Sequence, residues 1–263
     1  MNRRKNVEVL PLSRIGTFDV GVIGNRKHQI VGLLEADVTE ARARLRALRR
    51  EGRGASFTAW VIKTVGSTIA QTPEVQGMRR GRRRRVVFPD VDVAVMVERR
   101  VEGVAVPLPM VIRQAEAKSL TEIETEIQAA SSQAIEGTRD YELGRRRSPI
   151  LMRFFYRLPQ FLRVAAMQGI LRNPERRKQM MGTVIVTSVA SVVRFPGWII
   201  PKTMHNVAVG LGSVVRKPRV VGDQVLPRDV LHLTVVLDHD VVDGAPAARF
   251  ASRLVHNLEV FSV

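Results

Sequence analysis

The stretch LHLTVVLDHDVVDGAPAARF, residues 231–250, is the most informative part of this 263-residue chain. Its first seven residues are almost all apolar and include two adjacent valines, which predicts a buried β-strand. His239 and Asp243 follow that strand, and Gly244 then begins a Gly-Ala-Pro turn before a helix of small and apolar residues. A histidine at the end of a rigid strand can meet solvent, where it can act as a general base toward a thiol or hydroxyl.

The H-x-x-x-D-G pattern of His239, Asp243 and Gly244 resembles the catalytic signature of the acyltransferase subunits of 2-oxoacid dehydrogenase complexes. This family shares its fold with chloramphenicol acetyltransferase. Five further stretches are similar to the family in the same order: VEVLPLSRI (7–15), LLEADVTEARARLRALR (33–49), GVAVPLPMVIRQAEAKSLTEIETEI (103–127), GTVIVTSV (182–189) and HNVAVGLGSVVRKPRVVGDQV (205–225).

The resemblance implies a mixed α/β fold of the chloramphenicol acetyltransferase type, with helices packed on a mixed β-sheet and an active site at the interface of a homotrimer or a higher assembly. The chain itself reads as one domain over residues 1–263, with strand-like and helix-like runs in alternation and no linker or repeat. The first strand-like runs are GVIG at 21–24 and QIVGLLEADV after it. We therefore expect one catalytic domain, without a lipoyl or subunit-binding domain.

The resemblance also implies the chemistry, which is acyl transfer between coenzyme A and a thiol of the dihydrolipoyl type, a hydroxyl or an amine. His239 would be the base, Asp243 would orient the loop, and Thr187 would stabilise the oxyanion. Ser188 takes the place of Thr187 if the strand slips by one residue, because neighbouring strand residues face opposite sides. A lipoyl group could arrive only on another protein. The alternative is a non-catalytic trimeric scaffold that keeps the fold.

Several positions depart from the family. The usual Pro-His pair reads Lys27-His28, the arginine after the histidine is Asp240, and the first helix looks shortened. The partner of Asp243 is open: Arg14, Arg26 or an arginine of a neighbouring subunit could serve.

An insertion at about residues 138–181 is apolar, aromatic and basic at once. We expect Pro159 to bend or break any helix there. Two interpretations stay open for residues 145–178: packing on the domain with arginine stems covering apolar surface, or contact with an anionic membrane surface. On either interpretation Phe161 and Leu162 belong to an apolar face and Arg163 lies at its margin.

The chain carries 42 Lys and Arg against 25 Asp and Glu, a formal charge of +17. Part of this charge is the run Arg79–Arg85, which could be a solvated hairpin tip, could steer anionic coenzyme A, or could bind nucleic acid. Without a nucleic-acid motif we regard the last as unlikely. The chain has no cysteine, which excludes thiolate metal sites, and we assign no metal ligands. Without a signal peptide, we expect a cytoplasmic protein, and membrane contact through residues 145–178 would make it peripheral to the membrane.

Overall fold

A computed structural model of the chain describes residues 12–101, 104–132, 154–190, 192–193 and 195–262. One six-stranded mixed sheet organises the molecule, in the order β1-β8-β7-β6-β4-β5. Its strands are β1 (Gln29–Asp37), β4 (Val93–Val101), β5 (Val104–Ile112), β6 (Val184–Ser188), β7 (Val207–Val221) and β8 (Gln224–Asp238). Strand β6 runs parallel to both β4 and β7, and the remaining neighbours are antiparallel. A separate two-stranded hairpin pairs β2 (Met78–Arg80) with β3 (Arg84–Val86).

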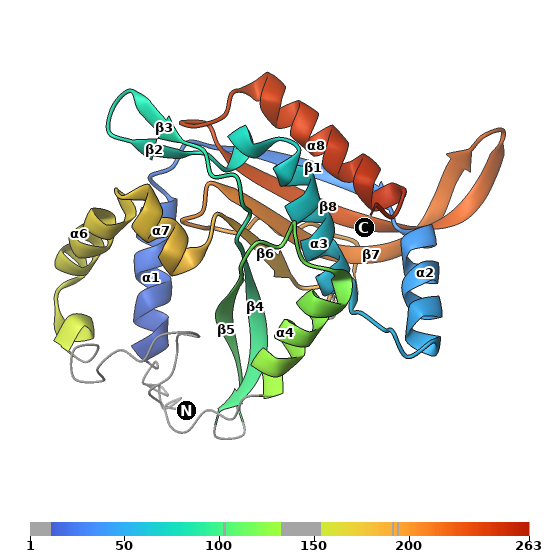
Figure 1. Ribbon diagram of the computed structural model, residues 1–263, viewed down its shortest axis with the longest axis horizontal. Helices are drawn as coiled ribbons and strands as arrows, with labels where there is room; N and C mark the ends of the chain where they lie inside the picture. The colour runs from blue at the N-terminus through green and yellow to red at the C-terminus, as the bar shows by residue number, and fades with distance from the viewer. Residues whose placement is uncertain (1–11, 102–103, 133–153, 191, 194, 263) are drawn as a thin grey trace, which may run out of the picture.

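Helices surround this sheet as Figure 1 shows. They are α1 (Leu12–Gly24), α2 (Thr39–Arg50), α3 (Phe57–Ala70), the short 3₁₀ helix η1 (Pro73–Gln76), α4 (Leu120–Ser132), α6 (Gln160–Leu171), α7 (Pro174–Met181) and α8 (Gly244–Glu259). The core forms where α3, α4 and α8 pack on one face of the sheet. Trp60, Val61, Val65 and Ile69 of α3 are fully buried there. The expected α/β fold with helices on one face is confirmed.

The face of the sheet away from this core carries the other set of side chains. In β6, Val184 and Val186 belong to the core, so Thr187 points to the opposite face. Part of that face is crossed by the segment around Gly197. A Cβ at Gly212 would lie 2.2 Å from the carbonyl oxygen of Gly197, so glycine is required for this close approach.

Two local expectations from the sequence are wrong. The run GVIG at 21–24 is the end of helix α1 and not a strand, and the first helix is present with 13 residues. Gly244 begins α8 directly, so the Gly-Ala-Pro segment is its first turn and Asp243 its N-cap residue. A proline is tolerated there because the first backbone N–H groups of a helix have no partner within it.

The insertion forms helices α6 and α7, which lie beside α1 at one end of the molecule (Figure 1). Pro159 breaks the helical path as expected and becomes the N-cap residue of α6. Arg163 is buried and not marginal: its Nε and Nη2 donate to the fully buried carboxylate of Asp19 in α1, at 2.7 and 3.0 Å. Phe161 and Leu162 remain exposed. Residues 138–153 of the insertion lie outside the described residues.

Candidate active site at the end of strand β8

The exposed His239 lies directly after β8, the second strand of the sheet. Its backbone N–H donates to the carbonyl of His28 at 2.6 Å, which extends the β1–β8 pairing by one residue beyond Gln29 and Asp238. Two segments that are far apart in the sequence therefore meet at this corner. Its imidazole is in the solvent-facing position that the sequence indicates.

Asp243 stands four residues later with an exposed side chain. Its backbone carbonyl accepts from Ala247 N at 3.1 Å, but its side chain makes no capping hydrogen bond. Arg14 and Arg26 are both exposed, and in the described part of the chain no ion pair joins either of them to Asp243. Of the three candidates, the arginine of a neighbouring subunit is the one that a single chain cannot test.

Thr187 and Ser188 end strand β6 and point to opposite faces. Thr187 pairs in register with Gly210 of β7, which pairs with Thr234 of β8, which pairs with Leu33 of β1. These four residues form one row on the face away from the core, because directly paired strand residues share a face. Ser188 instead accepts a hydrogen bond from Ala190 N at 3.3 Å.

Thr187 and His239 are far apart within one chain. The register places Thr187 two strands away from Thr234, and His239 five positions beyond Thr234 along the chain. Strand spacing of about 4.8 Å and a rise of about 3.4 Å per residue put the two residues roughly 20 Å apart. They cannot contact the same carbonyl group within one subunit.

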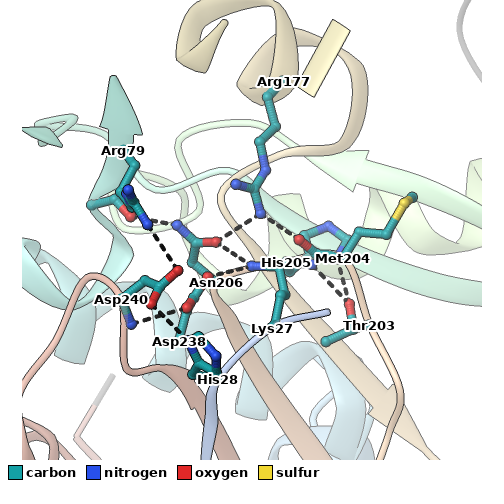
Figure 2. A network of polar contacts seen from close by, with 11 residues as sticks. Lys27, His28, Arg79, Arg177, Thr203, Met204, His205, Asn206, Asp238 and Asp240 are labelled. Carbon is teal, nitrogen blue, oxygen red and sulfur yellow. Dashed lines mark hydrogen bonds and ion pairs between the residues drawn. The ribbon is translucent and has the colours of Figure 1, made fainter. Parts of the chain in front are cut away.

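A buried polar network includes Asp238, the residue just before His239 (Figure 2). Lys27 Nζ donates to Asp238 Oδ2 at 2.5 Å and to Asn206 Oδ1 at 2.6 Å. Arg177 of α7 donates to the same amide oxygen at 2.7 Å, and Asn206 Nδ2 donates to the carbonyl of Gly77 at 2.6 Å. Asp238 is the residue before His239, so the network fixes the backbone that carries the imidazole.

The network contains two cations, Lys27 and Arg177, and one carboxylate, and burial lowers the pKa of both cations. Burial, together with the charge of Arg177, lowers the pKa of Lys27 to about 8, although Asp238 opposes the shift. Burial likewise lowers the pKa of Arg177 to about 10. Asp238 therefore holds a lysine that loses its proton at a lower pH than an exposed lysine does.

A second set of contacts, which is exposed, involves Asp240, the residue just after His239. His28 Nδ1 bonds to Asp240 Oδ1 at 2.9 Å, and Arg79 Nη1 donates to Asp240 Oδ2 at 2.9 Å (Figure 2). The hydrogen bond to Asp240, followed by its charge, raises the pKa of His28. In the sequence, the departures at 27 and at 240 are separate features. Their charges are the signal that joins them, because a basic residue, Lys27, replaces the proline of Pro-His while an acid, Asp240, replaces the family's arginine.

Comparison with known proteins shows the family of the chain. A family model described as the catalytic domain of 2-oxoacid dehydrogenases acyltransferase matches residues 29–142 and 176–262, about three quarters of the chain. The chain belongs to this family. The resemblance inferred from the sequence is confirmed, and residues 143–175, within the insertion, separate the two matched segments.

Two curated relatives are components of large complexes. The dihydrolipoyllysine-residue acetyltransferase component of the pyruvate dehydrogenase complex of Acholeplasma laidlawii is 29% identical over 99 residues, which cover 38% of this chain and 18% of the relative. The dihydrolipoyllysine-residue succinyltransferase component of the mitochondrial 2-oxoglutarate dehydrogenase complex 1 of Arabidopsis thaliana is 23% identical over 208 residues, 79% of this chain and 36% of the relative. The chain thus matches about a third or less of these relatives.

Solved structures show the same fold. A probable dihydrolipoamide acetyltransferase from Listeria monocytogenes 4b F2365 superposes with a TM-score of 0.68 at 18% identity, covering 99% of this chain and 96% of that one. A chloramphenicol acetyltransferase superposes with a TM-score of 0.51 at 12% identity, covering 97% and 98%. The expected chloramphenicol acetyltransferase-like fold is confirmed. None of the helices described here has the length and apolar character to cross a membrane.

Proposed function

We propose that this protein is a coenzyme A-dependent acyltransferase that moves an acyl group between coenzyme A and a thiol of the dihydrolipoyl type, a hydroxyl or an amine. The observation that carries the proposal is the position of His239. In a chain of the acyltransferase family, the histidine of the H-x-x-x-D-G pattern is exposed at the end of β8, on a backbone held by a buried ionic network. The lipoyl group, if it is the acceptor, comes from outside this catalytic domain.

The reaction is a direct transfer. The neutral imidazole of His239 removes the proton from the acceptor thiol, and the sulfur forms a bond to the carbonyl carbon of the donor thioester. The resulting tetrahedral oxyanion collapses, the bond to the coenzyme A sulfur breaks, and the imidazolium returns its proton to that sulfur. General base catalysis of this kind contributes about 10²–10⁴-fold in rate.

Thr187 donates to the oxyanion, and it comes from a neighbouring copy. The separation of roughly 20 Å within one chain supports this assignment, since both groups must reach one carbonyl. The face that carries Thr187 also carries the exposed side chains of Val31 and Leu33, an apolar surface that suits a subunit interface. We propose a homotrimer, with an arginine of the neighbouring subunit beside Asp243.

The experiment compares coenzyme A release from a panel of acyl-coenzyme A donors with dihydrolipoamide as acceptor. We expect His239→Ala to lose about 10²–10⁴-fold in kcat and Thr187→Val about 10²–10³-fold, with Thr187→Ser largely active because it keeps the hydroxyl. If wild-type protein binds donor without turnover, the acceptor class is wrong. If it binds no donor, the protein is a scaffold and the enzyme proposal fails.

We also propose that residues 145–178 contact an anionic membrane surface. Packing of α6 on α1 uses Arg163 and Val164, yet Phe154 and Phe161 remain 63% and 70% exposed. Such aromatic side chains, with the exposed Arg157 nearby, suit the boundary between headgroups and acyl chains.

Co-sedimentation with vesicles containing anionic lipid tests the membrane proposal. Wild-type protein should sediment, and Phe154→Ser/Phe161→Ser should bind several-fold less. The control is Val220→Ser/Val225→Ser, which removes equally exposed apolar side chains from the β7–β8 hairpin. No sedimentation of the wild type, or equal loss in both variants, contradicts the contact.

A further inference from the structure

The β2–β3 hairpin places arginines directly opposite one another. The six arginines between residues 79 and 85 are all exposed, and the register pairs Arg79 with Arg85 and Arg80 with Arg84. Like charges directly opposite each other across two strands are destabilising. Gly81, with φ of 70°, lets the chain turn between them. A hairpin of this composition needs anionic partners on both of its faces.

One face has such partners, and they belong to the loop that carries His239. Arg79 pairs with Asp240, and Arg85 Nη1 donates to the carbonyl of Val241 at 2.8 Å. Gly77, just before the hairpin, accepts the hydrogen bond from Asn206. The hairpin is therefore fixed to the catalytic corner by Arg79, which pairs with the Asp240 carboxylate, and by Arg85, which bonds to a neutral carbonyl.

The other arginines lack this compensation. Arg80 has Glu175 of α7 at 3.4 Å, but both side chains are more than half exposed, and such a pair contributes little. Among the described residues no carboxylate pairs with Arg82, Arg83 or Arg84. Together with Arg80 and Gly81 they line an open hollow of about 410 Å³. Four guanidinium groups around one open hollow give it a positive charge that suits a ligand with several negative charges.

We propose that this hollow binds the phosphate groups of the coenzyme A donor. The inference rests on the proposed acyltransferase function. Coenzyme A carries its phosphates on the nucleotide, and its thiol lies at the far end of a flexible pantetheine arm. The phosphates therefore need a site beside the catalytic corner and not within it. The planar fork of arginine matches phosphate oxygens with two parallel hydrogen bonds, which lysine cannot do.

Two donors and two variants test the site. Acyl-coenzyme A carries the phosphates, and acyl-pantetheine has the same thioester without them. In Arg82→Gln/Arg83→Gln/Arg84→Gln, the KM for acyl-coenzyme A should rise about tenfold while kcat and the KM for acyl-pantetheine stay unchanged. The control, Arg46→Gln/Arg49→Gln/Arg50→Gln, removes the same charge from exposed positions of α2 at the other end of the molecule (Figure 1).

The outcomes separate this inference from the proposed function. If wild-type protein transfers the acyl group but the hairpin variant keeps its KM, or matches the α2 variant, the phosphate site is wrong and the enzyme stands. If wild-type protein turns over neither donor, the proposed function fails. Calorimetric titration with coenzyme A then tests the phosphate site by itself. If wild-type protein binds coenzyme A and the hairpin variant does not, the phosphate site is supported; if wild-type protein does not bind coenzyme A, the phosphate site is wrong.

Discussion

Replacing Arg163 by methionine should release helix α6 from the domain. The guanidinium makes two hydrogen bonds to Asp19, whose side chain is 1% exposed, and a third to the carbonyl of Leu158 at 2.5 Å. Methionine fills similar space but leaves the Asp19 carboxylate buried without its partner, which costs about 3–5 kcal/mol. Replacing both partners by apolar residues removes the buried charge, so Asp19→Leu/Arg163→Met should recover most of the loss.

Hydrogen exchange of the α6 amides, read by mass spectrometry, is the assay, because α6 can open locally while the sheet stays folded. A loss of about 3–5 kcal/mol speeds exchange of residues 160–171 roughly 100- to 4000-fold in Arg163→Met. Amides of α3, on the core side of the sheet, should not change. Exchange in the single variant within tenfold of wild type, or a double variant as fast as the single one, would refute the reasoning.

Three further predictions concern protons. Burial lowers the pKa of His205 to about 3, so between about pH 6.5 and 3 the unfolded chain binds a proton at this residue and the folded chain does not. The free energy of unfolding should therefore fall by up to roughly 1.4 kcal/mol for each pH unit of acidification. In urea titrations, His205→Gln should make this dependence on pH less steep. Lys27, with its pKa lowered to about 8, makes the free energy of unfolding rise between pH 8 and 10.5, by roughly 3 kcal/mol in total; an unchanged rise in Lys27→Met would contradict this. In NMR titrations, Asp240→Asn should lower the raised pKa of His28, and no movement would remove Asp240 as the cause.

The main elements of the fold could be predicted because their local signals agree with their surroundings. Strand β8 reads as apolar and is buried over Leu231–Leu237, and α3 shows helical spacing and forms the core. The end of helix α1 reads as a strand in the sequence because Val22 and Ile23 favour strands. Tertiary packing decides there instead: Asp19 and Ile23, one helical turn apart, are both buried.

The candidate site likewise has residues that the sequence predicts and contacts that it does not. The sequence predicts His239 and Asp243 as site residues because the motif is local, and the alternation of β6 puts Thr187 and Ser188 on opposite faces. The supporting contacts join distant segments, such as Lys27 with Asp238 and Arg177 with Asn206. One sequence shows which residues are charged but not which of them meet. That information came only with the sheet order.

The contact between Lys27 and Asp238 also determines when this corner of the molecule can form during translation. These residues are 211 positions apart, and among the described strands β1 has β8 as its one neighbour in the sheet. At about 5–20 residues per second, a ribosome needs roughly 10–40 s to make the chain between them. During that time β1 lacks its partner strand, while α3 and the β4–β5 pair can already form. The corner that holds His239 therefore forms only after both of these distant segments have been translated.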